Sequence, residues 1–159
     1  MSDPISIRSA ARADTALVLQ FIRSLAEYER LAGEVEATEE RILETLFGDA
    51  PYAHCVIACA GDVPAGFAIY FHNYSTFLAK PGLYLEDLFV KPEFRGRGIG
   101  RALLLHLAGI ARELGCGRFE WTVLDWNTPA IDFYRSIGAR LMEEWKLCRV
   151  DGASLENLR

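Results

Sequence analysis

A run of alternating arginine and glycine residues, Arg95-Gly96-Arg97-Gly98-Ile99-Gly100, is the part of the sequence best suited to binding an anion. It follows the apolar run Leu83–Val90 and precedes a helical pattern, so it joins a predicted strand to a predicted helix. Glycines at such a junction let backbone N–H groups converge on an anion at the positive end of the helix. Arg95, Arg97 and Arg101 add positive charge. The same residues also fit a flexible loop with solvated arginines, and this alternative stays open at this point.

Two common nucleotide-binding motifs do not match this run. A Walker loop ends in Gly-Lys-Ser/Thr, and a dinucleotide fingerprint has a different glycine spacing early in a βαβ unit. The remaining pattern is Arg-x-x-Gly-x-Gly after Leu88-Phe89-Val90.

The composition indicates one globular domain over residues 1–159, with 51% hydrophobic and 25% charged residues. The formal net charge is −5 and the basic residues are spread along the chain. Nucleic-acid binders concentrate positive charge, so a nucleic-acid partner is not expected. An acidic chain favours cationic partners instead.

The cysteines and histidines predict neither a metal site nor a disulfide framework. Cys55, Cys59, Cys116 and Cys148 lack C-x-x-C spacing, and the three histidines have no second ligand at metal spacing. A reducing cytoplasm fits this cysteine usage best. No apolar stretch approaches the roughly 20 residues that span a bilayer, and Met1-Ser2-Asp3-Pro4 is unlike a signal peptide, so we expect a soluble protein with no membrane partner.

The hydrophobic pattern predicts a mixed α/β (α+β) fold in which helices cover a central sheet. The expected strands are Ile5–Arg8, Ala53–Ala60, Val63–Phe71, Leu83–Val90, Arg118–Leu124 and Ala139–Val150. The expected helices follow Asp14, Thr38 and the glycine-rich run, and a short one covers Asn127–Ile137. Gly61-Asp62 is typical of a hairpin turn, and Tyr74–Gly82 is expected to be a loop.

Five strings in the same order resemble the GNAT superfamily of N-acetyltransferases, and in particular its diamine (spermidine/spermine) and thialysine N-acetyltransferase branch. They are Leu25-Ala26-Glu27-Tyr28-Glu29, Tyr84-Leu85-Glu86-Asp87, Arg95 to Gly100, Leu124-Asp125-Trp126-Asn127 and Phe133-Tyr134. The resemblance extends over nearly the whole chain. It implies a mixed, mostly antiparallel sheet with helices on both faces.

The resemblance also implies acetyl-CoA as co-substrate, without a metal. The glycine-rich run would bind the pyrophosphate of coenzyme A, and Asn127 would lie beside the cofactor. The resemblance places the cofactor against the following residues: Leu88, Phe89 and Val90 through main-chain groups, and Arg95, Gly96, Arg97, Gly98, Ile99, Gly100 and Arg101 at the pyrophosphate. A helix cap is the structural alternative for Asn127.

Two residues match the catalytic positions of the family. An alkylammonium of pKa about 10.4 is only about one part in 10³ neutral at pH 7, so transfer to an amine needs a proton acceptor or relay. The resemblance places Glu86 near the amine for this purpose, whereas an exposed strand carboxylate is the alternative. Tyr134 matches the general acid that protonates the leaving thiolate, and otherwise it would pack in the core.

The acceptor implied by the resemblance is a primary amine of a small cationic molecule, either a diamine or polyamine or a lysine-like amino acid such as thialysine. Tyr28, Glu29, Glu86 and Glu144 match positions of the amine pocket, where negative charge suits a cation. Ser75 stands where the polyamine enzymes carry an acidic residue, and Tyr74-Ser75-Thr76 is more similar to the thialysine-acetylating relatives.

Two other functions stay open from the sequence. A non-catalytic acyl-CoA sensor would keep the glycine-rich run but would not need Tyr134, and an acetyltransferase could also act on a protein amine. Relatives of this branch commonly form homodimers, which the resemblance implies here as well.

Overall fold

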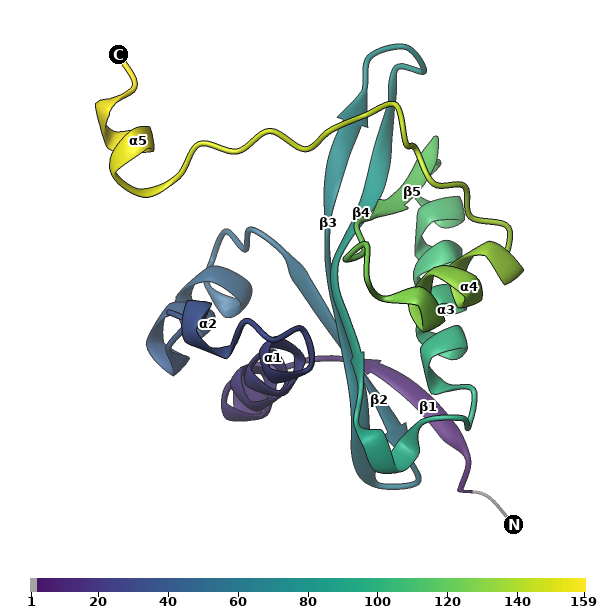
Figure 1. Ribbon diagram of the computed structural model, residues 1–159. Coiled ribbons are helices and arrows are strands. Elements are labelled where there is room, and N and C mark those ends of the chain that lie inside the picture. The colour runs from purple at the N-terminus through teal and green to yellow at the C-terminus, as the bar shows by residue number, and fades with distance from the viewer. Residues whose placement is uncertain (1–2) are drawn as a thin grey trace. The chain divides into compact units, whose positions relative to one another are not determined.

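The computed structural model describes residues 3–159, which form two compact units (Figure 1). The first unit ends at Thr122 and the second runs from Val123 to Arg159. Among the described residues, the first unit contains the sheet and three α-helices, and the second contains two α-helices.

The sheet has five strands in the order β1-β2-β3-β4-β5. They are β1 (Ile5–Ser9), β2 (His54–Ala60), β3 (Val63–Ser75), β4 (Lys80–Val90) and β5 (Arg118–Trp121). Every neighbouring pair is antiparallel except β4 and β5, which are parallel. The mixed, mostly antiparallel sheet is therefore confirmed.

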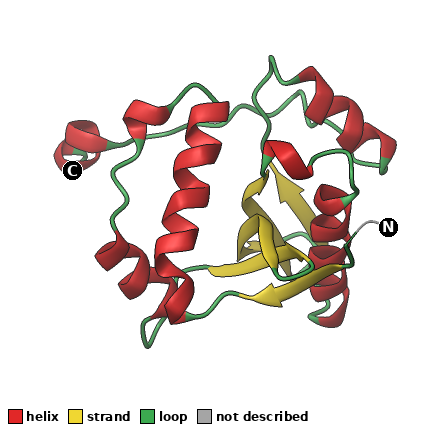
Figure 2. Cartoon of the chain, turned by 90° about the horizontal axis from the view of Figure 1, so that it is seen from below, coloured by secondary structure: helices red, strands yellow, loops and turns green. Residues whose placement is uncertain are grey.

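Helices lie on both faces of this sheet, as expected. The helices α1 (Thr15–Tyr28) and α2 (Glu39–Phe47) lie on one side of it, and α3 (Ile99–Glu113) lies on the other (Figure 1). Figure 2 shows the strands between helices from a second direction. Thr38 accepts a hydrogen bond from the Arg41 N–H at 3.2 Å, which confirms the predicted cap of α2.

The main apolar core lies between α1 and the sheet. The Phe21 ring of α1 stacks on Phe67 of β3, with ring centroids 5.0 Å apart, and meets the edge of Phe89 of β4. Burying each such side chain stabilises the fold by about 1.5–3 kcal/mol. On α3, Leu103 and Leu107 are fully buried, as their helical spacing predicts. The middle of α1 is thereby packed against β3 and the end of β4.

Two predicted boundaries in this unit are wrong. The segment Tyr74–Gly82 was expected to be a loop, but β3 continues to Ser75 and β4 begins at Lys80, which pair with each other. Pro81 and Gly82 look like turn residues, yet pairing with β3 holds them in the sheet. The fifth strand ends at Trp121 instead of Leu124 because β4 and β5 pair only as far as Leu85 and Trp121.

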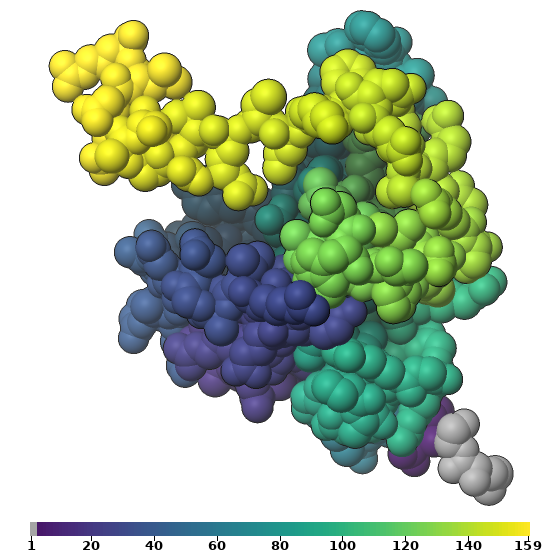
Figure 3. All heavy atoms as spheres, in the orientation of Figure 1, coloured from purple at the N-terminus to yellow at the C-terminus, as the bar shows by residue number. Residues whose placement is uncertain are grey.

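The second unit contains α4 (Thr128–Ser136) and the short α5 (Gly152–Asn157). The helix α4 confirms the helix predicted over Asn127–Ile137, and Gly138, with φ +95°, follows its end. The predicted strand Ala139–Val150 is wrong for the single chain, since these residues run between α4 and α5 with a turn at Glu143-Glu144 and without a strand partner among the described residues. Figure 3 draws the C-terminal part, in yellow, as a narrow run of atoms ending in α5.

Among residues 3–159, no helix is long and apolar enough to cross a bilayer.

Candidate active site

The glycine-rich run forms the turn between β4 and α3. Gly96 and Gly98 have φ of +74° and +81°, in the left-handed region that favours glycine. A Cβ at either position would meet no heavy atom within 4 Å, so backbone conformation rather than crowding explains the glycines. The first hydrogen bond of α3 runs from the Ala102 N–H to the Gly98 carbonyl at 2.9 Å. The backbone N–H groups before Ala102 have no acceptor within the helix and can bind an anion.

The three arginines of this region have different surroundings. Arg95 donates from Nε to the Val90 carbonyl at 2.9 Å, and its guanidinium lies 4.9 Å from the ring centroid of Tyr28. The guanidinium of Arg97 lies 5.2 Å from the Phe94 ring, and Arg101 is exposed in the first turn of α3. Arg95 therefore fastens the turn to β4 and α1, whereas Arg97 and Arg101 remain at the surface near the helix N-terminus.

One edge of β4 is left without a strand just before the turn. β5 pairs with β4 only over Gly82–Leu85, so the edge from Glu86 to Val90 has no neighbouring strand among the described residues. The Lys91 N–H bonds to the Ala65 carbonyl of β3 at 2.8 Å. Since successive residues of a strand direct their main-chain groups to opposite edges, those of Phe89 face β3 and those of Leu88 and Val90 face the free edge. An extended ligand can form main-chain hydrogen bonds with this edge, although the Val90 carbonyl already accepts a hydrogen bond from Arg95.

Glu86 lies at an irregularity in β4. Ile69 of β3 pairs with Asp87 and Tyr70 pairs with Leu85, which leaves Glu86 as the extra residue between them. Such a bulge interrupts the ladder and redirects a side chain. Glu86 is exposed, whereas its neighbours in the strand are partly or fully buried.

Three carboxyl groups gather where α1 ends beside β4. The pKa of Asp87 is raised to about 7, mainly by burial and to a smaller extent by the charges of Glu86 and Glu29. Burial also raises the pKa of Glu29, which directly follows α1. The cluster consists of Glu29, Glu86 and Asp87. A cationic group bound here would relieve the repulsion among them.

Asp87 is not among the site residues expected from the sequence. The sequence feature that could have indicated Asp87 is a second carboxylate directly after Glu86, inside a strand that is otherwise largely apolar. A charged residue in a buried strand is uncommon unless it is paired or functional. Asp87 was missed because the sequence does not show which face of the strand is covered by α1.

Three predicted site residues belong to the second unit. The Asn127 side chain accepts a hydrogen bond from the Ala130 N–H at 3.4 Å, so it caps α4 as the structural alternative predicts. Tyr134 lies on α4 with its ring 5.7 Å from that of Phe133, and Glu144 lies in the turn between α4 and α5.

Residues 19–139 match the acetyltransferase (GNAT) family. The chain belongs to this family. It is 38% identical to a thialysine N-epsilon-acetyltransferase of Sus scrofa, over 97% of this chain and 96% of that protein. It is 33% identical to an L-ornithine N5-acetyltransferase of Arabidopsis thaliana, over 94% of this chain and 86% of that protein.

The fold is also found in solved structures. An integron cassette protein from the mobile metagenome of V. cholerae has a TM-score of 0.79 and 32% sequence identity, covering 96% of this chain and 95% of that one. The GNAT-like fold and the assignment to the N-acetyltransferases, a group of acyltransferase enzymes, are therefore confirmed.

Proposed function

We propose that this GNAT acetyltransferase moves the acetyl group of acetyl-CoA directly to a primary amine of a small cationic acceptor. The observation that carries the proposal is the combination, within one unit, of an anion-binding turn and a carboxyl cluster on the same strand. Gly96 and Gly98 follow the free edge of β4, and Glu86 and Asp87 begin that edge. An anionic cofactor and a cationic acceptor can thus bind at the two ends of one short segment.

The turn and the free edge fit coenzyme A. The backbone N–H groups of Gly98, Ile99 and Gly100 bind the pyrophosphate, with Arg97 and Arg101 supplying charge nearby. The extended pantetheine follows the edge of β4 and bonds to the main chain at Leu88 and Val90. The side chain of Phe89 serves the core instead, since it is buried against Phe21.

The carboxyl cluster binds the acceptor as an ammonium ion. Glu29, Glu86 and Asp87 attract the cation, and Tyr28 lines the same end of α1. A carboxylate with a pKa near 7 is also suited to accepting a proton at neutral pH, directly or through water. Asp87 has that pKa, so it shares with Glu86 the removal of the ammonium proton.

The acetyl group then moves directly between the two bound substrates. The neutral amine nitrogen attacks the acetyl carbonyl carbon and the new C–N bond forms. The nitrogen of the resulting tetrahedral intermediate loses its second proton to water, and the C–S bond breaks as coenzyme A leaves as a thiolate. Tyr134 donates its phenolic proton to the thiolate sulfur, as in the family that it matches. Asn127 lies beside the cofactor in this scheme and Glu144 contributes to the amine pocket.

A lysine-like amino acid is the acceptor that we favour. The similar proteins are named for thialysine and ornithine, which are amino acids with a side-chain amine. The hydroxyl of Ser75 is buried and accepts a hydrogen bond from the Leu78 N–H at 3.3 Å, so it shapes the β3–β4 turn and adds no negative charge. A polyamine carries further positive charges and would bind more tightly with a carboxylate at this position.

The proposal is tested by the release of coenzyme A from acetyl-CoA in the presence of different amines. Thialysine, lysine, ornithine, putrescine and spermidine form the panel, and norleucine is the matched control that lacks the side-chain amine. We expect faster release with thialysine, lysine or ornithine than with norleucine or without acceptor. If no amine causes release, calorimetry with acetyl-CoA shows which part of the proposal is wrong. Binding of acetyl-CoA without turnover would favour the non-catalytic acyl-CoA sensor, and absence of binding would contradict the cofactor site.

A further inference from the structure

The strand β5 carries an ion pair that the proposed reaction does not use. Nε of Arg118 lies 3.5 Å from Oε1 of Glu120, and the two side chains are 45% and 38% exposed. An exposed ion pair of this length contributes little to stability, so both side chains can turn to a charged ligand at low cost. The pair involves Nε of Arg118, which leaves the two terminal nitrogens of the guanidinium to bind a carboxylate through two hydrogen bonds.

The register of the sheet places this ion pair on the same face as the carboxyl cluster. In β3, Ile69 and Phe71 project from one face, because side chains alternate along a strand. Asp87 pairs with Ile69, and Tyr84 pairs with both Phe71 and Glu120. Since directly paired residues project from the same face of a sheet, Asp87 and Glu120 share one face. It is the face on which Ile69 belongs to the core beneath α1.

The distance between the ion pair and the carboxyl cluster suits a lysine-like molecule. Glu120 pairs with Tyr84, which precedes Glu86 by two residues and Asp87 by three. A strand rises about 3.3 Å per residue, so these carboxyl groups begin about 7–10 Å further along β4. The side-chain nitrogen of an extended lysine lies five bonds, or about 6–7 Å, from its α-carbon. One such molecule can therefore reach both places.

Asn73 and Gly82 hold Glu120 in this position. Nδ2 of Asn73 donates a hydrogen bond to Oε1 of Glu120 at 3.5 Å. A Cβ at position 82 would clash with the Asn73 side chain, so the glycine lets the amide lie over β4. Oδ1 of Asn73 is buried and accepts no hydrogen bond from residues 3–159. An unsatisfied buried acceptor is rare and unfavourable, which indicates that this amide is placed for a purpose other than stability.

We propose that Arg118 and Glu120 bind the α-carboxylate and the α-ammonium group of an amino-acid acceptor, an inference that rests on the proposed function. The side-chain amine of the same molecule then lies at the carboxyl cluster. The charges of the bound acceptor complement those of the ion pair. A diamine has no carboxylate for Arg118, and the guanidinium repels its second ammonium ion. The pair thus selects an amino acid over a diamine of the same length.

The proposal is tested with matched acceptors that differ by one charged group. Thialysine is compared with bis(2-aminoethyl) sulfide, which lacks only the carboxylate, and with 3-(2-aminoethylthio)propanoate, which lacks only the α-amino group. Lysine, cadaverine and 6-aminohexanoate form a parallel series. We expect kcat/KM for the amino acid to exceed that for either analogue by about tenfold or more, because each analogue loses a hydrogen-bonded ion pair.

Two variants assign the charged groups of the acceptor to the two residues. Arg118→Gln is expected to lower kcat/KM for the amino acid by about tenfold or more and to leave the diamine unchanged. Glu120→Gln is expected to lower kcat/KM for the amino acid and to leave the analogue without the α-amino group unchanged. Arg112→Gln, at an exposed position of α3 on the other side of the sheet, is the matched control and should alter none of the three.

The outcomes separate this proposal from the proposed function. If no acceptor of either series is acetylated, the proposed function is wrong and the amino-acid site falls with it. If the unmodified protein acetylates the amino acid and the diamine equally well, acetyl transfer stands and the amino-acid site is wrong. An equal loss for all three acceptors in Arg118→Gln would show a structural role of Arg118 and would also overturn the proposal.

Discussion

Arg95 donates a hydrogen bond from Nε to the main-chain carbonyl of Val90 at 2.9 Å, and this bond joins the glycine-rich turn to the last residue of β4. The guanidinium also lies against the rings of Tyr28 and Phe89, at 4.9 and 5.4 Å from their centroids. One side chain thus holds the end of α1, the end of β4 and the start of the turn together. The sequence suggested a phosphate-binding role for Arg95, and its contacts give it a further role in supporting the turn.

Substitution of Gly98 by alanine is expected to weaken the binding of acetyl-CoA. Gly98 has φ +81° where the anion-binding N–H groups begin, so a Cβ strains the backbone and projects near the pyrophosphate. Loss of about one hydrogen bond to a charged group corresponds to about a tenfold or larger rise in Kd, which calorimetry measures.

Gly115→Ala is the matched control for Gly98→Ala. Gly115 has φ +68° beyond the other end of α3, and a Cβ there also meets nothing within 4 Å. Both variants therefore carry similar backbone strain, and only Gly98→Ala is expected to lose affinity. Equal losses in the two variants would remove the turn from the cofactor site.

Substitution of Asp87 by asparagine is expected to stabilise the protein at pH 8 and to lower its activity. The pKa of Asp87 is about 7 in the folded protein and lies near its ordinary 3.8 in the unfolded chain. The folded state therefore holds the proton more tightly, and stability falls as the pH rises from about 4 through 7. The amide that replaces the carboxyl group is neutral at every pH, so the free energy of unfolding at pH 8 should rise by about 4 kcal/mol, at about 1.4 kcal/mol for each unit of the difference in pKa.

Urea unfolding at pH 5 and pH 8, together with kcat/KM for the amine, measures these effects of Asp87→Asn. Asp62→Asn, in the exposed β2–β3 turn, is the control and should change neither quantity. If Asp87→Asn left kcat/KM and its pH profile unchanged, Asp87 would have no part in binding or deprotonating the amine.

Substitution of Tyr134 by phenylalanine is expected to lower kcat by about 10²–10⁴-fold, since general acid catalysis has this magnitude. The KM for the amine should change little, because the variant retains the ring and loses only the phenolic hydroxyl group. Steady-state kinetics measure both constants, with Tyr52→Phe, an exposed tyrosine after α2, as control. An unchanged kcat would exclude Tyr134 as the acid.

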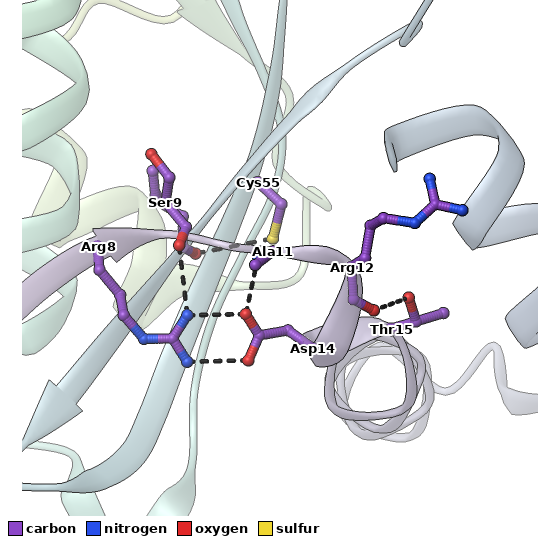
Figure 4. A network of polar contacts seen from close by, with 8 residues as sticks. Arg8, Ser9, Ala11, Arg12, Asp14, Thr15 and Cys55 are labelled. Atoms are coloured by element: carbon purple, nitrogen blue, oxygen red, sulfur yellow. Dashed lines mark hydrogen bonds and ion pairs between the residues drawn. The ribbon is translucent and has the colours of Figure 1, made fainter. Parts of the chain in front are cut away.

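Substitution of Asp14 by alanine is expected to destabilise the first unit at neutral pH. Asp14 accepts two hydrogen bonds from Arg8, at 2.7 and 2.9 Å, and one from the Ala11 N–H at 2.8 Å, and so joins β1 to the start of α1 (Figure 4). The loss should be about 1–2 kcal/mol, because Arg8 is half exposed.

The pH dependence of this loss has a defined sign. The hydrogen bond from Arg8 holds the pKa of Asp14 below its ordinary 3.8. The contribution of the Asp14 carboxylate to the free energy of unfolding is therefore fully present above pH 3.8. It disappears as the pH falls through the lower pKa of Asp14 in the folded state. Urea unfolding at pH 7 and near pH 2 measures the loss of stability in Asp14→Ala relative to the unmodified protein, with Glu36→Ala, at an exposed position, as control. An equal loss at both pH values would contradict a stabilising role of the charged Asp14 carboxylate.

The parts of the fold that depend on local chemistry could be predicted from the sequence. Thr38 caps α2 through its own hydroxyl, and Gly96 and Gly98 have the left-handed backbone that only glycine adopts readily. The spacing of Leu103 and Leu107 predicted the buried face of α3. Each of these features is decided within a few residues of chain.

The features that depend on pairing between distant strands could not be predicted. The bulge at Glu86 and the free edge after Leu85 arise from how β3 and β5 align with β4. The raised pKa of Asp87 depends on the cover given by α1 and on Glu29. The strand predicted over Ala139–Val150 has a suitable pattern but no partner in the single chain, and a pattern alone does not supply one.

The most direct test of the central claim is mass spectrometry of the acceptor after incubation with the protein and acetyl-CoA. The account predicts that thialysine, lysine or ornithine gains one acetyl group on its side-chain nitrogen, with one coenzyme A released for each product. Norleucine should remain unmodified. If acetyl-CoA binds but every cationic amine of the panel is recovered without an acetyl group, the proposed reaction is wrong.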